Sequence, residues 1–334
     1  MNPLYYELLN GTLPPITATP VVSGVITNNL PIPVAFSTFP DPGFPHDNVA
    51  DTIPSAATAS INSGYLVLTV PGTGGLIGVI AYPSSEGNNA EFTVDDTTLS
   101  TPNDIGPIPV PTYCPPVPAL NPPNPPLGIY PPGTRVANST TIIPGDSPRV
   151  LVGCGVAPNG NLITREQYWE RQGDSICLAG NEKRTVSFTL VSGTQRVSSK
   201  EQEVAGSISS SVKGGWGAVS ASVSASLSAN SKTFQQVTVT EESTSYISQT
   251  IKNPHKDPIM YLRWQLVDVI TVFELSADSF NRKTIMTPVS SIVTSQSPVV
   301  VMGPYWINPP ASVTQGVLAG AEPQAVPDGL FEYS

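Results

Sequence analysis

The chain of 334 residues is long enough for two domains, and it carries 37 prolines and 27 glycines but only 12% charged residues. Soluble domains average about 25% charged residues, so this scarcity of charge argues against a disordered chain, and the prolines argue against long helices. The net charge of −10 argues against nucleic-acid binding, which needs a basic surface. The composition fits an all-β protein with many turns best.

Residues 1–100 read as short strands separated by proline and glycine. Two apolar runs, 65–70 and 76–82, flank Pro-Gly-Thr-Gly-Gly and predict a hairpin, and the alternating run 90–94 predicts a further strand. We expect a small β-sandwich-like domain that faces a receptor or another partner. The first residues lack the basic region and the long apolar core of a signal peptide, so we expect a mature secreted form or a protein released by lysis.

The middle of the chain predicts a spacer followed by a short helix. Residues 101–148 are rich in proline, which favours an extended linker or a strap along another surface. Thr-Arg-Glu-Gln at 164–167 has the spacing of a helix-capping box and predicts a helix over 164–172.

The three cysteines have no metal-like spacing. Cys114, Cys154 and Cys177 allow one disulfide plus a free thiol, or three reduced thiols. Cys154 with Cys177 is the preferred pair, although the sequence demands none.

Longer strands are expected from residue 185 onward, in a long-stranded β domain over 149–307 followed by a tail at 308–334. The expected strands are 185–191, 234–240, 246–251, 261–273, 284–294 and 299–306. The run 261–273 is apolar on much of both faces, which predicts a central strand. The fold class is therefore all-β and elongated, with long antiparallel strands in the C-terminal half.

Residues 203–229 can be paired as one β-hairpin with Gly215 and Trp216 at its turn, inside the run Gly214-Gly-Trp-Gly217. One face is then apolar and the other carries serine. The opposed apolar pairs are Val212 with Val219, Ile208 with Val223, and Val204 with Leu227.

Each arm of this hairpin has about the 9–11 residues that cross a bilayer in a β-barrel, and Trp216 would anchor the rim. The alternatives are an outer hairpin of an ordinary sandwich, or a Ser/Ala-rich strand pair of a stacked, fibrous sheet. The apolar face has few large side chains, so burial of one hairpin in lipid contributes little free energy and insertion would need many subunits.

Catalytic and metal-binding motifs are missing from the sequence. The two histidines stand in proline-flanked turns without a partner motif, and the acidic pairs lack calcium-ligand spacing. We expect no enzymatic activity, no cofactor and no metal.

Residues 185–273 resemble the aerolysin-like β-pore-forming proteins, including the epsilon-toxin and mosquitocidal-toxin branch. The likeness lies in long Ser/Thr-rich strands, such as the run 238–246, that flank an amphipathic and nearly uncharged hairpin. The resemblance implies a water-soluble protomer that binds a receptor or glycan on a cell membrane, assembles into a homo-oligomer and inserts residues 203–229.

Two functions remain open from the sequence. The first is a pore-forming protein, of the kind found among secreted toxins and virulence factors. The second is a structural or adhesive β-protein, such as a fibre, coat or surface-layer subunit, that assembles through its Ser/Ala-rich strands.

Overall fold

The computed structural model describes residues 23–38, 51–62, 65–81, 90–96, 98–99, 146, 149–197, 206–208, 215–228, 239–240, 242–254, 256, 259–278, 283–306 and 331–333. The expected linker 101–148 and tail 308–334 lie almost wholly outside these residues. The expected division of the chain at 100, 148 and 307 stays a prediction.

Seven short strands form a small sandwich in the N-terminal part: β1 (Ser23–Asn28), β2 (Val34–Thr38), β3 (Asp51–Ile53), β4 (Ala57–Asn62), β5 (Tyr65–Thr69), β6 (Leu76–Ala81) and β7 (Ala90–Val94). One layer has the strand order β4-β1-β7, and the other, β6-β5-β2-β3, is the end of a larger sheet. Apolar side chains from both layers share one buried core that includes Ile26, Phe36, Leu68 and Val94. The predicted hairpin around residues 71–75 and the strand at 90–94 are confirmed.

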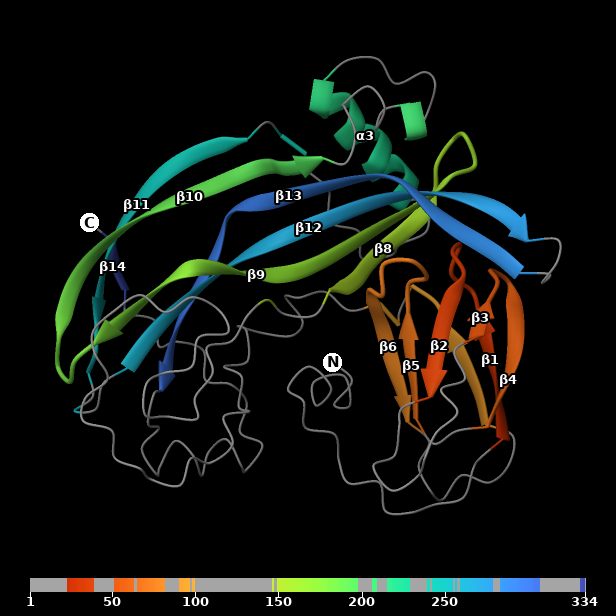
Figure 1. Cartoon of the computed structure of the whole chain (residues 1–334), viewed down its shortest axis with the longest axis horizontal. Helices are drawn as coiled ribbons and strands as arrows, with labels where there is room; N and C mark the ends of the chain where they lie inside the picture. Colours follow the sequence, from red (N-terminus) through yellow and green to blue (C-terminus); the bar gives the residue numbers. More distant parts are fainter. Residues whose placement is uncertain are drawn as a thin grey trace.

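The C-terminal part is built from long strands: β8 (Val150–Val156), β9 (Leu162–Leu178), β10 (Lys183–Val197), β11 (Ser243–Lys252), β12 (Ile259–Asp278) and β13 (Lys283–Trp306), with the short β14 (Phe331–Tyr333). They form a curved sheet in the order β14-β11-β10-β13-β12-β9-β8, which continues into β6 of the sandwich (Figure 1). β12 lies between β9 and β13, as its apolar sequence predicts. The all-β class is confirmed.

The two faces of the long sheet have different neighbours. Successive side chains of a strand point to opposite faces. On β12, Phe273 packs into the core of the N-terminal sandwich, whereas Ile270 and Val272 belong to a second apolar cluster that contains residues of the helix α3 (Gly215–Ser228). The sandwich and α3 therefore lie on opposite sides of the sheet (Figure 1).

The predicted hairpin over 203–229 is wrong for this fold, because Gly215–Ser228 is an α-helix and residues 206–208 are helical as well. Val219, Val223 and Leu227 recur every four residues, and all three are buried on one stripe of the helix. Glycine, serine and valine are weak helix formers, and the helix has no acidic side chain in its first turn and no basic one in its last. Burial of this stripe against the sheet, a tertiary effect, therefore decides the conformation.

The helix predicted over 164–172 is also wrong, because these residues belong to β9. Residues 162–167 of β9 pair with β8 on one side, and nearly all of β9 pairs with β12 on the other. These long-range ladders outweigh the local capping pattern, and Glu166, expected at a helix start, is buried in the sheet.

Cys154 is a free thiol buried under the sandwich, so the preferred pairing with Cys177 is wrong. Burial raises the pKa of this thiol to about 12, with a smaller contribution from the charge of Asp96. Cys114 lies outside the described residues.

Candidate functional site

Residues 198–242 connect two neighbouring antiparallel strands, β10 and β11, and we call them the tucked segment. A direct connection between such strands would be a simple hairpin. The described parts of this one, residues 206–208, 215–228, 239–240 and 242, instead include α3, which lies across the sheet at β8 and β9 (Figure 1). The site that the sequence singled out is thus an apolar element stored against the protein's own sheet.

An apolar cluster holds the tucked segment to the sheet. Ile208, Val219, Val223 and Leu227 have no exposed surface. They share this cluster with Ala157, Ile163, Val239, Ile270, Val272 and Ile292, and Trp216 packs at its edge. Full burial of one such aliphatic side chain contributes about 1.5–3 kcal/mol, so this cluster is the main source of docking free energy.

Two glycines in β8 form the floor under the C-terminal end of α3. A Cβ atom on Gly155 would lie 2.0 Å from the carbonyl oxygen of Ser226, so α3 approaches the strand as closely as only glycine permits. A Cβ on Gly153 would meet Leu227 and Arg165 at 3.9 Å, an ordinary contact distance.

Polar contacts tie the tucked segment down where it leaves the apolar cluster. The hydroxyls of Ser207 and Ser290 lie 2.7 Å apart, which joins the segment to β13. The side-chain amides of Asn159 and Asn161 both donate to the carbonyl of Ser207, at 2.7 and 2.8 Å.

A second set of polar contacts holds the end of the segment. The amide of Val239 donates to the hydroxyl of Ser220 at 2.5 Å, and the amide of Thr194 on β10 donates to the carbonyl of Thr240 at 2.9 Å. Residues 239–240 therefore bridge α3 to β10.

The same residues form one apolar face in a strand and in a helix. Residues four apart point to the same side of a strand, because four is an even number, and they lie about one turn apart in a helix of 3.6 residues per turn. Val219, Val223 and Leu227 have this spacing, and Ser220 and Ser224 follow it on the polar side. The amphipathic pattern found in the sequence is therefore real, although it is used here by a helix.

The structure brings half of the predicted site residues together in one apolar cluster. Ile208, Val219, Val223 and Leu227 are buried in the cluster, Trp216 packs at its edge, and Gly215 and Gly217 are exposed at the start of α3. Val204, Val212 and Gly214 lie outside the described residues. Membrane insertion by this set stays a prediction.

Sequence reasoning missed the sheet side of this contact. Gly153 and Gly155, the asparagines Asn159 and Asn161, and Ser290 all hold the tucked segment, and none was predicted. The alternation Val-Gly-Cys-Gly-Val was the available signal, because glycine inside a strand marks a close backbone approach.

Buried ionisable side chains lie on both faces of β9 in this region. On the α3 side of the sheet, the Arg165 guanidinium donates to both carboxylate oxygens of Asp268, at 3.1 and 3.0 Å, and this pair joins β9 to β12. Removing one partner of such a pair costs about 3–5 kcal/mol.

Glu166 lies on the other face of β9, against the β5–β6 turn of the sandwich. The Thr73 hydroxyl donates to Oε1, a Cβ on Gly75 would clash with the same oxygen, and Oε2 is buried without a hydrogen-bond partner. Burial raises the pKa of this carboxyl, while the Thr73 hydrogen bond and the positive charge of Arg149 act in the opposite direction.

Among the described residues, no cluster of three or more His, Cys, Asp or Glu side chains is placed to hold a metal ion. In the same part of the chain, no helix is both long and apolar enough to cross a membrane.

Comparison with solved structures gives distant likenesses, and two of them are described here. The chain aligns with Cry35Ab1 at a TM-score of 0.31 and 13% identity, covering 75% of this chain and 60% of Cry35Ab1. It aligns with pro-Monalysin, an oligomeric pore-forming toxin, at a TM-score of 0.23 and 16% identity, covering 52% of this chain and 75% of that protein. Both scores are too low to establish a common topology. No protein-family model and no curated protein matches the sequence.

Proposed function

We propose that this protein forms membrane pores, with the tucked segment leaving the sheet and inserting as a β-hairpin. The observation that carries the proposal is the position of α3. The segment that connects two adjacent antiparallel strands has a single charged residue, Lys213, between positions 205 and 231. Its residues Gly215–Ser228 form a helix on the sheet and not an arm of a hairpin.

The pairing of β10 with β11 supplies a register for the released hairpin. The ladder pairs Lys183 with Lys252 and runs without a shift to Ser192 with Ser243. Continued at the same register, it would place Gly217 and Ala218 at the turn, two residues beyond the turn expected from the sequence. The apolar pairs would then be Trp216 with Val219, Val212 with Val223, and Ile208 with Leu227.

The opposite face of this extended hairpin would be lined by hydroxyl groups. Its pairs would be Ser211 with Ser224, Ser209 with Ser226, and Ser207 with Ser228. In the folded protein the amide of Thr194 bonds to the carbonyl of Thr240, one residue out of this register, so release has to straighten the ladder at that point. The extension keeps the apolar side chains on the face that carries Phe188 and Leu190 on β10.

Insertion requires several copies of the chain. A single hairpin in lipid would leave the hydrogen-bonding groups along its edges unpaired, at several kcal/mol each, so only a closed oligomeric β-barrel satisfies them. A cell membrane is therefore the partner, with a receptor or glycan to concentrate this acidic protein on it, and the protein acts outside the cell that makes it.

A structural or adhesive function is the second candidate, and the edge of the sheet favours it. On one side, β11 pairs with β10 along its whole length. On its other side, β14 pairs only with Gln249, Thr250 and Ile251, so among the described residues no strand covers Ser243–Ser248 on that side. Open strand edges promote pairing between chains.

Leakage and electron microscopy separate the two functions. The protein is added to dye-loaded liposomes and to target cells, and the products are imaged by negative stain. The proposal expects rings together with dye release. Filaments or sheets without leakage would establish the structural function instead.

A further inference from the structure

The β5–β6 turn of the sandwich rests on the long sheet, and we call residues 70–76 together with Glu166 of β9 the Glu166 joint. A Cβ on Gly75 would clash with Oε1 of Glu166, and a Cβ on Gly72 would lie 3.5 Å from the Phe273 ring of β12. Gly72 and Gly74 have φ angles of +87° and +72°, a conformation that glycine favours. The turn therefore lies on β9 and β12 more closely than residues with side chains would allow.

The joint contains the backbone link between the sandwich and the long sheet. The amide of Leu76 donates to the carbonyl of Arg149 at 2.8 Å, and Leu76 with Val150 is the one pair that β6 and β8 form among the described residues. Apolar side chains of both parts, among them Leu151 and Phe273, also meet in one core. Opening the joint would leave this core in place and remove the strand pairing.

Glu166 is a buried carboxyl in a mostly apolar setting. Its side chain has no exposed surface, and its direct strand partners are Leu151 on β8 and Val269 on β12. From the turn, the Thr73 hydroxyl donates to Oε1 and accepts from the amide of Gly75 at 3.1 Å, whereas Oε2 has no hydrogen-bond partner. A charged oxygen buried without a partner costs more free energy than a neutral one, so the closed joint disfavours the carboxylate.

Arg149, just before β8, is the charged group that acts on the Glu166 carboxyl. It is exposed, and its guanidinium lies 5.3 Å from the centre of the Tyr168 ring. Tyr168 is the next side chain on this face of β9, and its hydroxyl donates to Glu170 at 3.4 Å. The charge of Arg149 favours the carboxylate from solvent but leaves Oε2 without a hydrogen bond.

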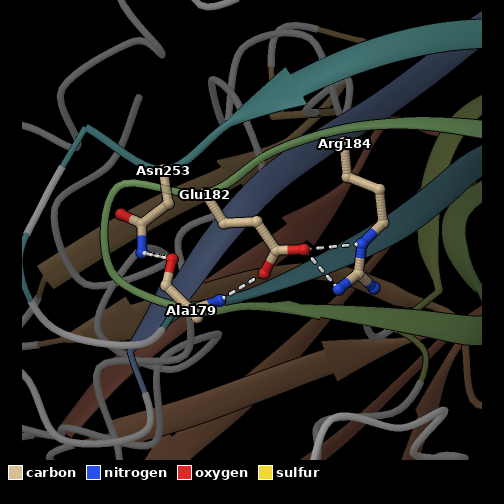
Figure 2. A network of polar contacts seen from close by, with 4 residues as sticks. All are labelled: Ala179, Glu182, Arg184 and Asn253. Atoms are coloured by element: carbon tan, nitrogen blue, oxygen red, sulfur yellow. Dashed lines mark hydrogen bonds and ion pairs between the residues drawn. The ribbon is translucent and has the colours of Figure 1, made fainter.

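The carboxyl of Glu182, in the β9–β10 turn, has the opposite surroundings (Figure 2). Oε2 accepts from the amide of Ala179 at 2.7 Å, Oε1 accepts from the Arg184 guanidinium at 2.8 Å, and Asn253 donates to the carbonyl of Ala179 at 2.9 Å. Burial acts to raise the pKa of Glu182, but the bonds from Ala179 and Arg184 outweigh it and lower this pKa. Glu182 therefore holds its turn as a carboxylate, which Glu166 is not placed to do.

We propose that the Glu166 joint is a pH-sensitive device, in which the neutral carboxyl keeps the β5–β6 turn on the long sheet and loss of its proton to water opens the turn. In the open state water reaches both carboxylate oxygens and supplies the hydrogen bonds that the closed joint lacks. Because the pKa of Glu166 is raised, the joint is held most firmly below the ordinary pKa of a glutamate and loosens as pH rises through the folded pKa.

Hydrogen exchange of residues 70–76, followed by mass spectrometry without membranes, tests the device independently of pore formation. Protection is taken relative to the intrinsic exchange rate at each pH, which removes the direct effect of pH on exchange. From about pH 5 to about pH 8 it is expected to fall at least about fivefold, because an unpartnered buried charge carries a penalty of that order. At each pH residues 70–76 should be less protected than residues 265–273 of β12, since the joint opens while the sheet stays folded.

Variants tie the result to Glu166. Glu166→Gln should remove the pH dependence and keep the joint protected at about pH 8. With Glu166 intact, Arg149→Gln should extend the fall to higher pH, because it removes a charge that favours the carboxylate, whereas Arg149→Lys should behave as the unchanged protein does.

Glu182→Gln is the matched control at the other turn. It should loosen the β9–β10 turn and leave the pH dependence of residues 70–76 as it is. The same pH dependence in a folded Glu166→Gln would overturn the proposal. Equal protection of residues 70–76 and 265–273 would overturn it too, because the joint would then open only when the whole protein unfolds.

Discussion

Replacing Gly155 with alanine should loosen α3 without changing a single residue of the tucked segment. The added Cβ would lie 2.0 Å from the carbonyl oxygen of Ser226 and 2.8 Å from its carbonyl carbon. Both are backbone atoms, so no flexible side chain can move aside. The end of the helix, or the strand beneath it, has to shift.

The expected size of this effect follows from overpacking. Forcing one extra carbon into a close-packed contact costs about 1–3 kcal/mol. If the docked state bears this cost and the released state does not, the equilibrium for release rises about 5- to 150-fold. The released hairpin itself keeps its native sequence, so any change in activity arises from docking alone.

Hydrogen exchange of the amides in residues 215–228, followed by mass spectrometry, measures this equilibrium directly. Gly153→Ala, on the same strand, is the matched control, because a Cβ at this position would meet its nearest neighbours at 3.9 Å, an ordinary contact distance. We expect faster exchange and faster dye release for Gly155→Ala and little change for Gly153→Ala. Equal protection of α3 in both folded variants would refute the account of the glycine floor.

Two further predictions concern buried titratable groups. The raised pKa of Glu166 means that the folded protein favours its neutral form, so its contribution to stability is full below the unfolded pKa and is lost as pH rises through the folded pKa. Glu166→Gln should flatten this pH dependence of stability and raise the melting temperature at neutral pH. Unfolding free energies with the same pH slope for both proteins would contradict this prediction. Cys154, with a pKa of about 12, should resist iodoacetamide at pH 8 in the folded protein and react once guanidinium unfolds it, and rapid labelling of the native protein would show that the thiol is accessible.

The sequence predicted the strands well where the local pattern and the long-range pairing agree. The apolar run 65–70 is followed by turn residues, and the run 90–94 alternates between apolar and polar residues. Both regions form strands, β5 and β7. The run 261–273 is apolar on both faces, and β12 indeed has a strand on each side.

The pattern failed where a local signal competes with distant partners. Residues 164–167 carry a capping box, yet β8 and β12 pair with them from both sides. Residues 215–228 alternate as a strand would, but their four-residue spacing also suits a helix, and only the sheet surface selects between the two. The close contact at Gly155 depends on a residue some 70 positions away, which no local pattern reveals.

Whether the tucked segment must leave the sheet can be tested by locking it there. The hydroxyls of Ser207 and Ser290 lie 2.7 Å apart, and a disulfide needs about 2.05 Å between sulfurs, so the double variant Ser207→Cys/Ser290→Cys places two thiols within bonding reach. The two single variants and the unchanged protein, under the same oxidising and reducing conditions, account for the native cysteines.

Release of dye from liposomes by this double variant, oxidised and then reduced, is the most direct measurement. Oxidation should abolish leakage because the crosslink keeps position 207 on β13, and reduction of the same sample should restore leakage to the level of the single variants. Full leakage with the crosslink shown to be closed by mass spectrometry would contradict the account, since the pore would then form without release of this end of the tucked segment.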